Sequence, residues 1–198
     1  MLVLTAVRHG ESTLNAAGLL TGRLDPPLTA AGRAQAAALA AVAARPFDVR
    51  LHSGARRAAD TLRIACDAAG LPDVTLRSDP RWQERSFGEL EGAPSAAWAQ
   101  RPGVDDTPPG GESYRALGLR VFVALDELAI EGEAAGAAPF RVLLCAHSGV
   151  LRMLRGIADG AGHLDTLLGP GAVNGAVVEL LYEARPAAPP FLTAARRT

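Results

Sequence analysis

The sequence predicts an α/β domain, a three-layer α/β/α sandwich in which a mixed, mostly parallel sheet carries helices on both faces. The first observation is that the two strongest apolar runs, residues 2–7 and 142–146, are of strand length and almost continuously apolar. This is the pattern of strands that are covered on both faces. The second observation is that apolar runs, polar turns and helical periodicity alternate along the chain. Such alternation is typical of βαβ units.

Composition favours a single domain over residues 1–198, because no repeat or linker is visible and 48% hydrophobic residues are ample for one core. The net charge of -1 provides no broad basic surface, so neither nucleic acid nor a membrane is an expected partner. The sequence shows no long apolar segment and no basic leader at its N-terminus, which predicts a cytoplasmic protein. Its 2 cysteines are too few for a disulfide framework. The sequence leaves open whether the protein forms a homodimer.

The first predicted strand, residues 2–7, ends in Arg8-His9-Gly10. The carboxyl ends of buried strands are where α/β sheets hold ligands. Arg8 offers a planar fork of donors, His9 a nitrogen nucleophile or ligand, and Gly10 a close backbone approach. Together they suit a phosphoryl group. The alternative is that His9 is a turn histidine and Arg8 pairs with an acid, and the tripeptide alone leaves this open.

Residues 15–27 are rich in Gly, Thr, Asp and Pro, which predicts a loop over the carboxyl end of the first strand. This loop supplies candidate lining residues, namely Asn15, Thr21, Gly22 and Arg23. Thr29 then provides an N-cap for a helix that Pro46 stops.

A short second strand, residues 47–51, leads through a polar turn into a helix that runs to about residue 69. Arg57 falls in the first turns of this helix, where the N-terminus favours anions. The alternative for Arg56 and Arg57 is an exposed pair, and we expect one of the two to be exposed.

The second half of the chain repeats this logic after an irregular segment. Residues 74–76 predict a short third strand, and residues 79–111 predict an irregular but ordered lid over the carboxyl edge, because they contain several aromatic residues. A helix over 112–130 precedes the strand at 141–146, which ends in His147 and is followed by a helix over 150–159. Residues 172–181 predict a last strand, paired with 191–194.

Five polar side chains should therefore meet at one edge of the sheet: Arg8, His9, Arg57, Glu84 and His147. A metal site is the first rival, but two guanidinium groups would repel a cation unless several acids joined the shell. Two arginines, two histidines and a carboxylate fit phosphoryl transfer through a phosphohistidine better. The chain contains no Lys, so a phosphate-binding P-loop is excluded.

Six motifs in order give the chain its resemblance to the histidine phosphatase superfamily, also called the phosphoglycerate-mutase-like family. The resemblance extends from Leu4 to about Leu154 and includes the last predicted strand. Its motifs are Arg8-His9-Gly10-Glu11 with Asn15, Thr21-Gly22 with Asp25-x-x-Leu28-Thr29-x-x-Gly32-x-x-Gln35-Ala36, Ser53-x-x-x-Arg57-Ala58-x-x-Thr61, Glu84-x-x-Phe87-Gly88-x-x-Glu91-Gly92, Gly110-Gly111-Glu112-Ser113, and His147-x-Gly149.

The resemblance implies that His9 is the phosphorylated nucleophile and that Glu84 is the proton donor. It implies that the phosphoryl oxygens are held by Arg8, Arg57 and His147, with help from Asn15 and the backbone at Ser148. No metal or other cofactor is implied. Three positions depart from the family pattern and affect the shape of the pocket: His52 replaces a common Ser, Ser148 a common Gly, and Phe87 the Tyr of the mutases.

The resemblance favours a phosphatase acting on a small phosphorylated metabolite. A mutase must also hold a carboxylate and exclude water, and the compact lid and the lack of Lys argue against it. The mutase stays open because Arg85, Arg101 and Arg115 are candidates to bind a carboxylate. A non-catalytic phosphate-binding module would require a missing chemical group, and none is missing. Four aromatic residues in or next to the lid have two interpretations. If they touch the substrate, the leaving group is expected to be partly apolar; the alternative is that their rings only pack the lid. They are Trp82, Phe87, Trp98 and Tyr114.

Overall fold

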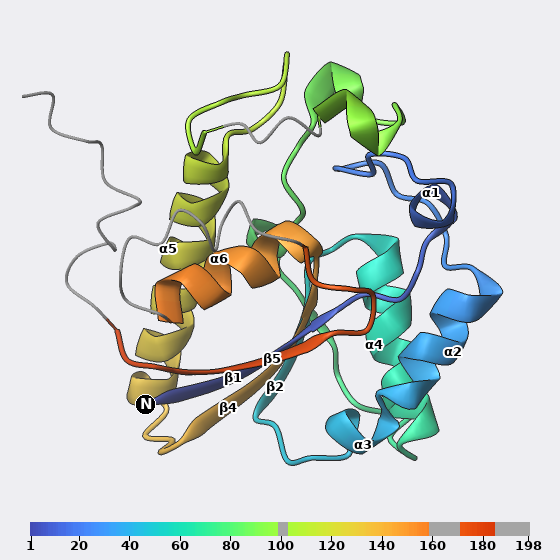
Figure 1. The fold of residues 1–198 in the computed structure, drawn as a ribbon. Helices are drawn as coiled ribbons and strands as arrows, with labels where there is room; N and C mark the ends of the chain where they lie inside the picture. The colour runs from blue at the N-terminus through green and yellow to red at the C-terminus, as the bar shows by residue number, and fades with distance from the viewer. Residues whose placement is uncertain (99–102, 159–170, 185–198) are drawn as a thin grey trace, which may run out of the picture.

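In the computed structural model, which describes residues 1–98, 103–158 and 171–184, five strands form one sheet in the order β3-β2-β4-β1-β5 (Figure 1). The four strands β3, β2, β4 and β1 are parallel, and β5 pairs antiparallel with β1. This confirms the mixed, mostly parallel sheet. The strands are β1 (Leu2–Arg8), β2 (Val49–His52), β3 (Arg77–Ser78), β4 (Phe140–Ala146) and β5 (Val177–Tyr182).

Helices cover both faces of the sheet, as β4 illustrates. Val142 and Leu144 belong to the core under α5 and α6, whereas Leu143 and Cys145 belong to a second core under α2, α3 and α4. Alternate side chains of a strand point to opposite faces, so a continuous apolar run fills both cores and confirms the three layers (Figure 1). The helices are α1 (Thr13–Ala16), α2 (Ala30–Ala38), α3 (Ala40–Ala43), α4 (Arg56–Ala68), α5 (Tyr114–Ala134) and α6 (Ser148–Ala158).

Hydroxyl side chains cap several of these helices. Ser12 accepts from the backbone N–H of Asn15 at the start of α1, Thr29 from Gly32 at the start of α2, and Ser113 caps α5 in the same way. Each cap satisfies a backbone donor that has no partner inside the helix. None of the helices in the described ranges is long and apolar enough to cross a membrane.

The structure departs from the predicted elements where tertiary contacts outweigh local pattern. The helix expected from Thr29 to Pro46 is broken at Leu39 into α2 and α3. The third strand lies at Arg77–Ser78 rather than at 74–76, because Val74 and Leu76 pack against the core under α4 instead of pairing. The last strand begins later than expected, at Val177, and its predicted partner, 191–194, lies outside the described residues.

The lid, residues 79–111, is irregular as predicted. Its described part contains three short 3-10 helices, Pro80–Trp82, Gly88–Leu90 and Ser95–Trp98. Backbone hydrogen bonds between Leu20 and Ala93 and between Gly92 and Leu20 join it to the loop that follows α1. The lid is therefore anchored above the end of the sheet at which β1 and β4 stop (Figure 1).

The turn after β1 packs backbone against backbone on the first turn of α2. A Cβ atom added to Gly10 would lie 2.2 Å from the carbonyl oxygen of Gly32, and one added to Gly32 would lie 2.0 Å from the carbonyl oxygen of Glu11. Neither contact involves a flexible side chain, so neither can be relieved cheaply. The two glycines thus fix the turn that follows His9.

We expect Gly32→Ala to lower the free energy of unfolding by about 1–3 kcal/mol, the usual cost of overpacking, even though Gly→Ala inside a helix normally stabilises by up to about 1 kcal/mol. Urea denaturation measures the change. The control is Ala34→Gly at an exposed position of the same helix, which should cost only the ordinary propensity difference. A stabilised Gly32→Ala protein would contradict the close packing.

Candidate active site

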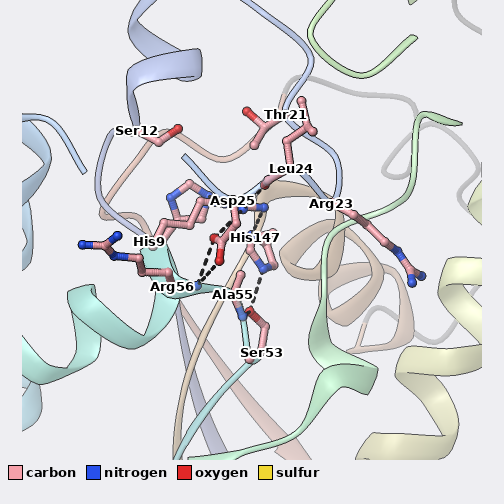
Figure 2. Close-up of polar contacts among 12 residues, drawn as sticks. His9, Ser12, Thr21, Arg23, Leu24, Asp25, Ser53, Ala55, Arg56 and His147 are labelled. Carbon is pink, nitrogen blue, oxygen red and sulfur yellow. Dashed lines mark hydrogen bonds and ion pairs between the residues drawn. The ribbon is translucent and has the colours of Figure 1, made fainter. Parts of the chain in front are cut away.

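A small pocket of about 80 Å³ opens at the carboxyl ends of the parallel strands. It is lined by Gly22, Arg23, Asp25, Gly54, Ala55, Arg57, Gln83, Glu84 and His147. The side chains come from the end of β4, the start of α4, the loop after α1 and the lid. The chain topology therefore brings together at this edge residues that are far apart in sequence (Figure 2). Of the five side chains expected to meet here, Arg57, Glu84 and His147 line the pocket, whereas Arg8 and His9 are not among its lining residues.

His9 follows β1 and is almost fully buried, with 3% of its surface exposed. Its Nδ1 lies 2.7 Å from the carbonyl oxygen of Gly10, which can only accept, so Nδ1 carries the proton. Its Nε2 accepts from Nε–H of Arg57 at 3.3 Å and so holds a lone pair. Burial and the charge of Arg57 lower the pKa of His9 to about 3. At neutral pH this imidazole is an uncharged base with its free electron pair on Nε2.

Arg57 is the centre of the site and only 1% exposed. Its Nη2 donates to the carbonyl oxygen of Gly22 at 2.9 Å and lies 3.2 Å from Nδ1 of His147. Its Nη1 donates to the carbonyl oxygen of Leu24 at 2.6 Å and lies 3.5 Å from Oδ1 of Asp25. Burial lowers the pKa of Arg57, an effect opposed first by Glu84. One guanidinium thus contacts both imidazoles.

His147 follows β4 and is fully buried. Because a guanidinium only donates, Nδ1 of His147 accepts from Arg57 and holds a lone pair. The proton of the neutral ring is then on Nε2, which donates to Oγ of Ser53 at 2.8 Å. Burial, followed by the charge of Arg57, holds the pKa of His147 well below its usual value. The two imidazoles, with ring centres 5.0 Å apart, are therefore neutral and of opposite tautomer.

Arg8 ends β1 beside this pair. Its Nη1 donates to the carbonyl oxygen of Ala172, while its Nε has no hydrogen-bond partner among the described residues. Burial lowers its pKa, opposed by the negative charge of Glu84. A buried donor without a partner is costly unless a ligand completes it.

Glu84 reaches the pocket from the lid. Its Oε1 accepts from the backbone N–H of Arg85 at 2.8 Å, and its Oε2 accepts from that of Gly149 at 3.1 Å, in the first turn of α6. A Cβ atom at Gly149 would lie 2.3 Å from Oε1, so only glycine leaves room for the carboxylate. None of the described ion pairs joins Glu84 to Arg56, Arg57 or Arg85.

The remaining predicted residues divide into two groups. Gly22 lines the pocket; Asn15 and Thr21 lie together, with Nδ2 of Asn15 donating to Oγ1 of Thr21 at 3.3 Å. The side chain of Arg23 extends away from the two imidazoles (Figure 2) and lies 3.7 Å from Glu112. Arg56 also points away (Figure 2) and pairs with Asp60 at 3.4 Å, so Arg56 is the exposed member of its pair.

Phe87 and Ser148 lie near the site without lining its pocket. The ring of Phe87 packs at 4.5 Å against the guanidinium of Arg85, which also stacks on Tyr114 at 4.0 Å. Ser148 begins α6 and lies against Gly171, where a Cβ atom would meet its Oγ at 2.5 Å.

Several residues of the site have partners that sequence patterns did not assign. Nδ2 of Asn174 donates to the carbonyl oxygen of His9 at 2.9 Å. Asp25 accepts from the backbone N–H of Arg56 at 3.0 Å and so caps α4, whose N-cap residue Ala55 has no polar side chain. Asp25 belongs to one of the six sequence motifs, but no role was predicted for it, whereas Asn174 belongs to none of these motifs. In the described ranges, no group of three or more His, Cys, Asp or Glu side chains is arranged to hold a metal ion.

A family model described as the histidine phosphatase superfamily (branch 1) matches residues 4–187. The chain belongs to this superfamily. The match extends over most of the sequence and includes Arg8, His9, Arg57 and His147, in agreement with the predicted resemblance.

Relatives within the superfamily are of two kinds. A 2,3-bisphosphoglycerate-dependent phosphoglycerate mutase of Rhizobium johnstonii is 37% identical over 174 residues, 79% of this chain and 79% of the mutase. A mutase of the same description from Gloeobacter violaceus is 36% identical over 165 residues, 78% of this chain and 74% of its own. The solved structure of a mycobacterial glucosyl-3-phosphoglycerate phosphatase with VO3 has a TM-score of 0.77 at 28% identity, covering 89% of this chain and 90% of that one. The protein is thus an enzyme of this superfamily, and its relatives include both mutases and phosphatases.

The neutral state of His147 leads to a prediction about anion binding. A sulfate dianion in the pocket favours the imidazolium form and raises the pKa of His147 from its depressed value. Binding should therefore take up protons, and sulfate affinity should rise as the pH falls through the range between the two pKa values. Calorimetry in buffers of different ionisation enthalpy measures this uptake.

The matched pair of variants for this experiment is His147→Gln and His52→Gln. The first should abolish proton uptake, whereas the second changes a histidine that does not line the pocket and should keep it. Uptake that persists in His147→Gln would assign the proton to another group.

Proposed function

We propose that this enzyme is a phosphomonoesterase that hydrolyses a small phosphorylated metabolite through a phosphohistidine on His9. The observation that carries the proposal is the unprotonated Nε2 of His9, which faces the Nε–H of Arg57 at 3.3 Å. A nitrogen nucleophile beside a cationic fork of donors is suited to attack a phosphoryl group. The positive charge that the reaction needs comes from arginines, so the proposed chemistry uses no metal ion or cofactor.

In the first step, the lone pair on Nε2 of His9 attacks phosphorus in line with the ester bond. The N–P bond forms as the P–O ester bond breaks. Arg8, Arg57 and the imidazolium of His147 neutralise the charge on the non-bridging oxygens. The incoming phosphoryl group takes the position at Nε2 of His9 that the Nε–H of Arg57 occupies. The guanidinium of Arg57 is then free to direct its donors to the phosphoryl oxygens.

We assign the role of proton donor to Glu84, which lines the same pocket as Arg57 and His147. An alkoxide leaving group is strongly basic unless a proton arrives in the transition state. Glu84 can supply it only when it carries the proton in the substrate complex. In the second step, water attacks phosphorus, its proton passes to Glu84, and the N–P bond breaks to return the lone pair to His9. Asn15 and Ser148 remain candidates to support the bound phosphoryl group.

The leaving group is proposed to be polar rather than apolar. Trp82 is fully buried in the core, and the other lid aromatics surround the guanidinium of Arg85. Beyond Arg23, the catalytic pocket borders an open groove of about 490 Å³ with a mostly hydroxyl, charged and backbone lining. The groove residues are Arg23, Ser86, Thr107, Gly110, Gly111, Glu112, Ser113 and Ala116. Such a lining suits a leaving group rich in hydroxyl groups.

Phosphoglycerate mutase activity is the second candidate. It is favoured by the mutase relatives and by Arg85, which is 1% exposed and whose guanidinium nitrogens have no hydrogen-bond partner among the described residues. An unpartnered buried cation is suited to a second anionic group of a substrate. Of the other two candidates, Arg115 pairs with Asp105 at 2.6 Å, and Arg101 lies outside the described residues.

A panel of phosphate esters assayed in EDTA tests the reaction class. We expect release of inorganic phosphate, faster from hydroxyl-rich esters than from apolar alkyl esters, because of the groove lining. With 3-phosphoglycerate we expect phosphate release to exceed formation of 2-phosphoglycerate. Fast isomerisation that a bisphosphorylated primer stimulates would assign the protein to the mutases, and activity that requires added metal would overturn the arginine-based mechanism.

Glu84→Gln should separate substrates by the quality of their leaving group. General acid catalysis is worth roughly 10²- to 10⁴-fold, so kcat/KM for an alkyl phosphate should fall by that order. The loss for p-nitrophenyl phosphate should be much smaller, because a nitrophenolate leaves without a proton. The control is Glu89→Gln, an exposed acid of the same lid, which should leave both rates unchanged. Equal losses for both esters in Glu84→Gln would reduce Glu84 to a structural carboxylate.

A further inference from the structure

We propose that Gln35 and Thr61 are positioning residues that hold the peptides on either side of Gly10 and thereby keep the lone pair of His9 on Nε2. Neither side chain lines the pocket, and neither has a role in the proposed chemistry. The inference rests on the proposed function in one respect only, namely that His9 is the nucleophile. The tautomer of His9 itself can be measured without turnover.

Gln35 of α2 anchors the peptide that follows Gly10. Its Oε1 accepts from the backbone N–H of Glu11 at 2.8 Å. In a trans peptide the carbonyl points opposite to the N–H, so this bond directs the carbonyl of Gly10 away from Gln35. That carbonyl accepts the Nδ1 proton of His9 at 2.7 Å. Gln35 therefore sets the direction of the one acceptor that fixes the His9 proton.

Thr61 of α4 anchors the peptide that precedes Gly10. Its side chain is fully buried, and its hydroxyl donates to the carbonyl oxygen of Arg57 at 2.7 Å. The single proton of the hydroxyl is thereby committed, so a lone pair faces the backbone N–H of Gly10, which donates to it at 3.0 Å. The nucleophile and the helix that carries Arg57 are joined by this bond.

Gly10 needs both anchors because it has no side chain of its own. Glycine must stand there, since the carbonyl oxygen of Gly32 would lie 2.2 Å from a Cβ atom, yet glycine also has the least restricted backbone. Two hydrogen bonds from separate helices offset that freedom. The bond from Thr61 closes a ring of hydrogen bonds that runs from Gly10 through Thr61, Arg57 and His9 back to Gly10. Gln35 supports this ring from outside through the next peptide.

The ring decides which nitrogen of His9 can react. If the Gly10 carbonyl turned away, Nδ1 would lose its acceptor and the proton would be free to occupy Nε2. A proton on Nε2 would remove the attacking electron pair and would face the Nε–H of Arg57, which also only donates. The wild-type arrangement avoids this pairing of two donors.

The test compares Gln35→Met with Gln35→Glu, and Thr61→Val with Thr61→Ser. The first variant of each pair removes the acceptor, whereas the second keeps an oxygen. ¹⁵N NMR shifts of the imidazole nitrogens, assigned by comparison with a His9→Asn protein, report the tautomer. We expect His9 to be protonated on Nδ1 in the wild type and in the oxygen-keeping variants, and to become a mixture in Gln35→Met and Thr61→Val.

Single-turnover phosphorylation supplies the functional readout. A shift of a reacting group by about an ångström can cost on the order of 10²-fold, so phosphoenzyme formation should slow by about that factor in Gln35→Met and Thr61→Val. KM should change little, and Gln35→Glu and Thr61→Ser should recover most of the rate. Circular dichroism and thermal melting establish that each variant is folded.

The outcomes separate this inference from the proposed function. Folded variants that lose activity while His9 keeps its Nδ1 proton would overturn the positioning role. An unchanged tautomer with unchanged activity would overturn it as well. If the tautomer becomes mixed but phosphoenzyme formation does not slow, the positioning role stands and His9 is not the nucleophile.

Discussion

A single guanidinium joins the two imidazoles of the site, and each ring turns a lone pair toward it. Arg57 can only donate hydrogen bonds, and it contacts Nε2 of His9 and Nδ1 of His147 at 3.3 and 3.2 Å. Each ring must therefore present a lone pair to it and carry its proton on the opposite nitrogen, where Gly10 and Ser53 accept. A protonated ring in the same place would set two donors and two positive charges against each other in a buried site. Burial is the first cause of the neutral state of both histidines, and the charge of Arg57 adds to it.

The residues that sequence could identify are those whose place depends on local pattern. His9 and His147 follow two buried apolar strands, and Arg57 falls at the start of a helix. Each could be located at the carboxyl edge because parallel strands end there together. Glu84 was placed at this edge as part of the lid, and its role as proton donor came only through the family resemblance, since an irregular lid has no periodicity from which its direction could be inferred.

What sequence could not provide are the contacts between segments. Asp25 caps a helix that begins 31 positions later in the chain, and Asn174 donates to His9 across 165 positions. The direction of the Arg23 side chain and the break of the helix at Leu39 likewise depend on packing. For the aromatic residues of the lid, the sequence allowed two interpretations, contact with substrate or packing within the protein. The rings that surround Arg85 show packing. Burial lowers the pKa of Arg85, and stacking on ring faces offsets a part of that cost, up to about 2 kcal/mol per desolvated contact.

The pairing of β1 with β4 determines the spacing of the two histidines. Arg8 is in register with Ala146, and the backbone N–H of His9 donates to the carbonyl oxygen of Ala146 at 3.0 Å, so His9 and His147 leave adjacent strands at the same level. Neighbouring strands lie roughly 4.8 Å apart in any sheet, and the imidazole centres are separated by 5.0 Å. The paired strands place the two histidines at the same level, and their rings are held by Arg57, Gly10 and Ser53, none of which belongs to the lid. Substitutions in residues 79–111, apart from Gln83 and Glu84, which line the pocket, can accordingly change which ester enters while the contacts of Arg57 with the two rings stay the same. Variation of the rest of the lid thus offers a route to new substrates that leaves the phosphoryl site intact.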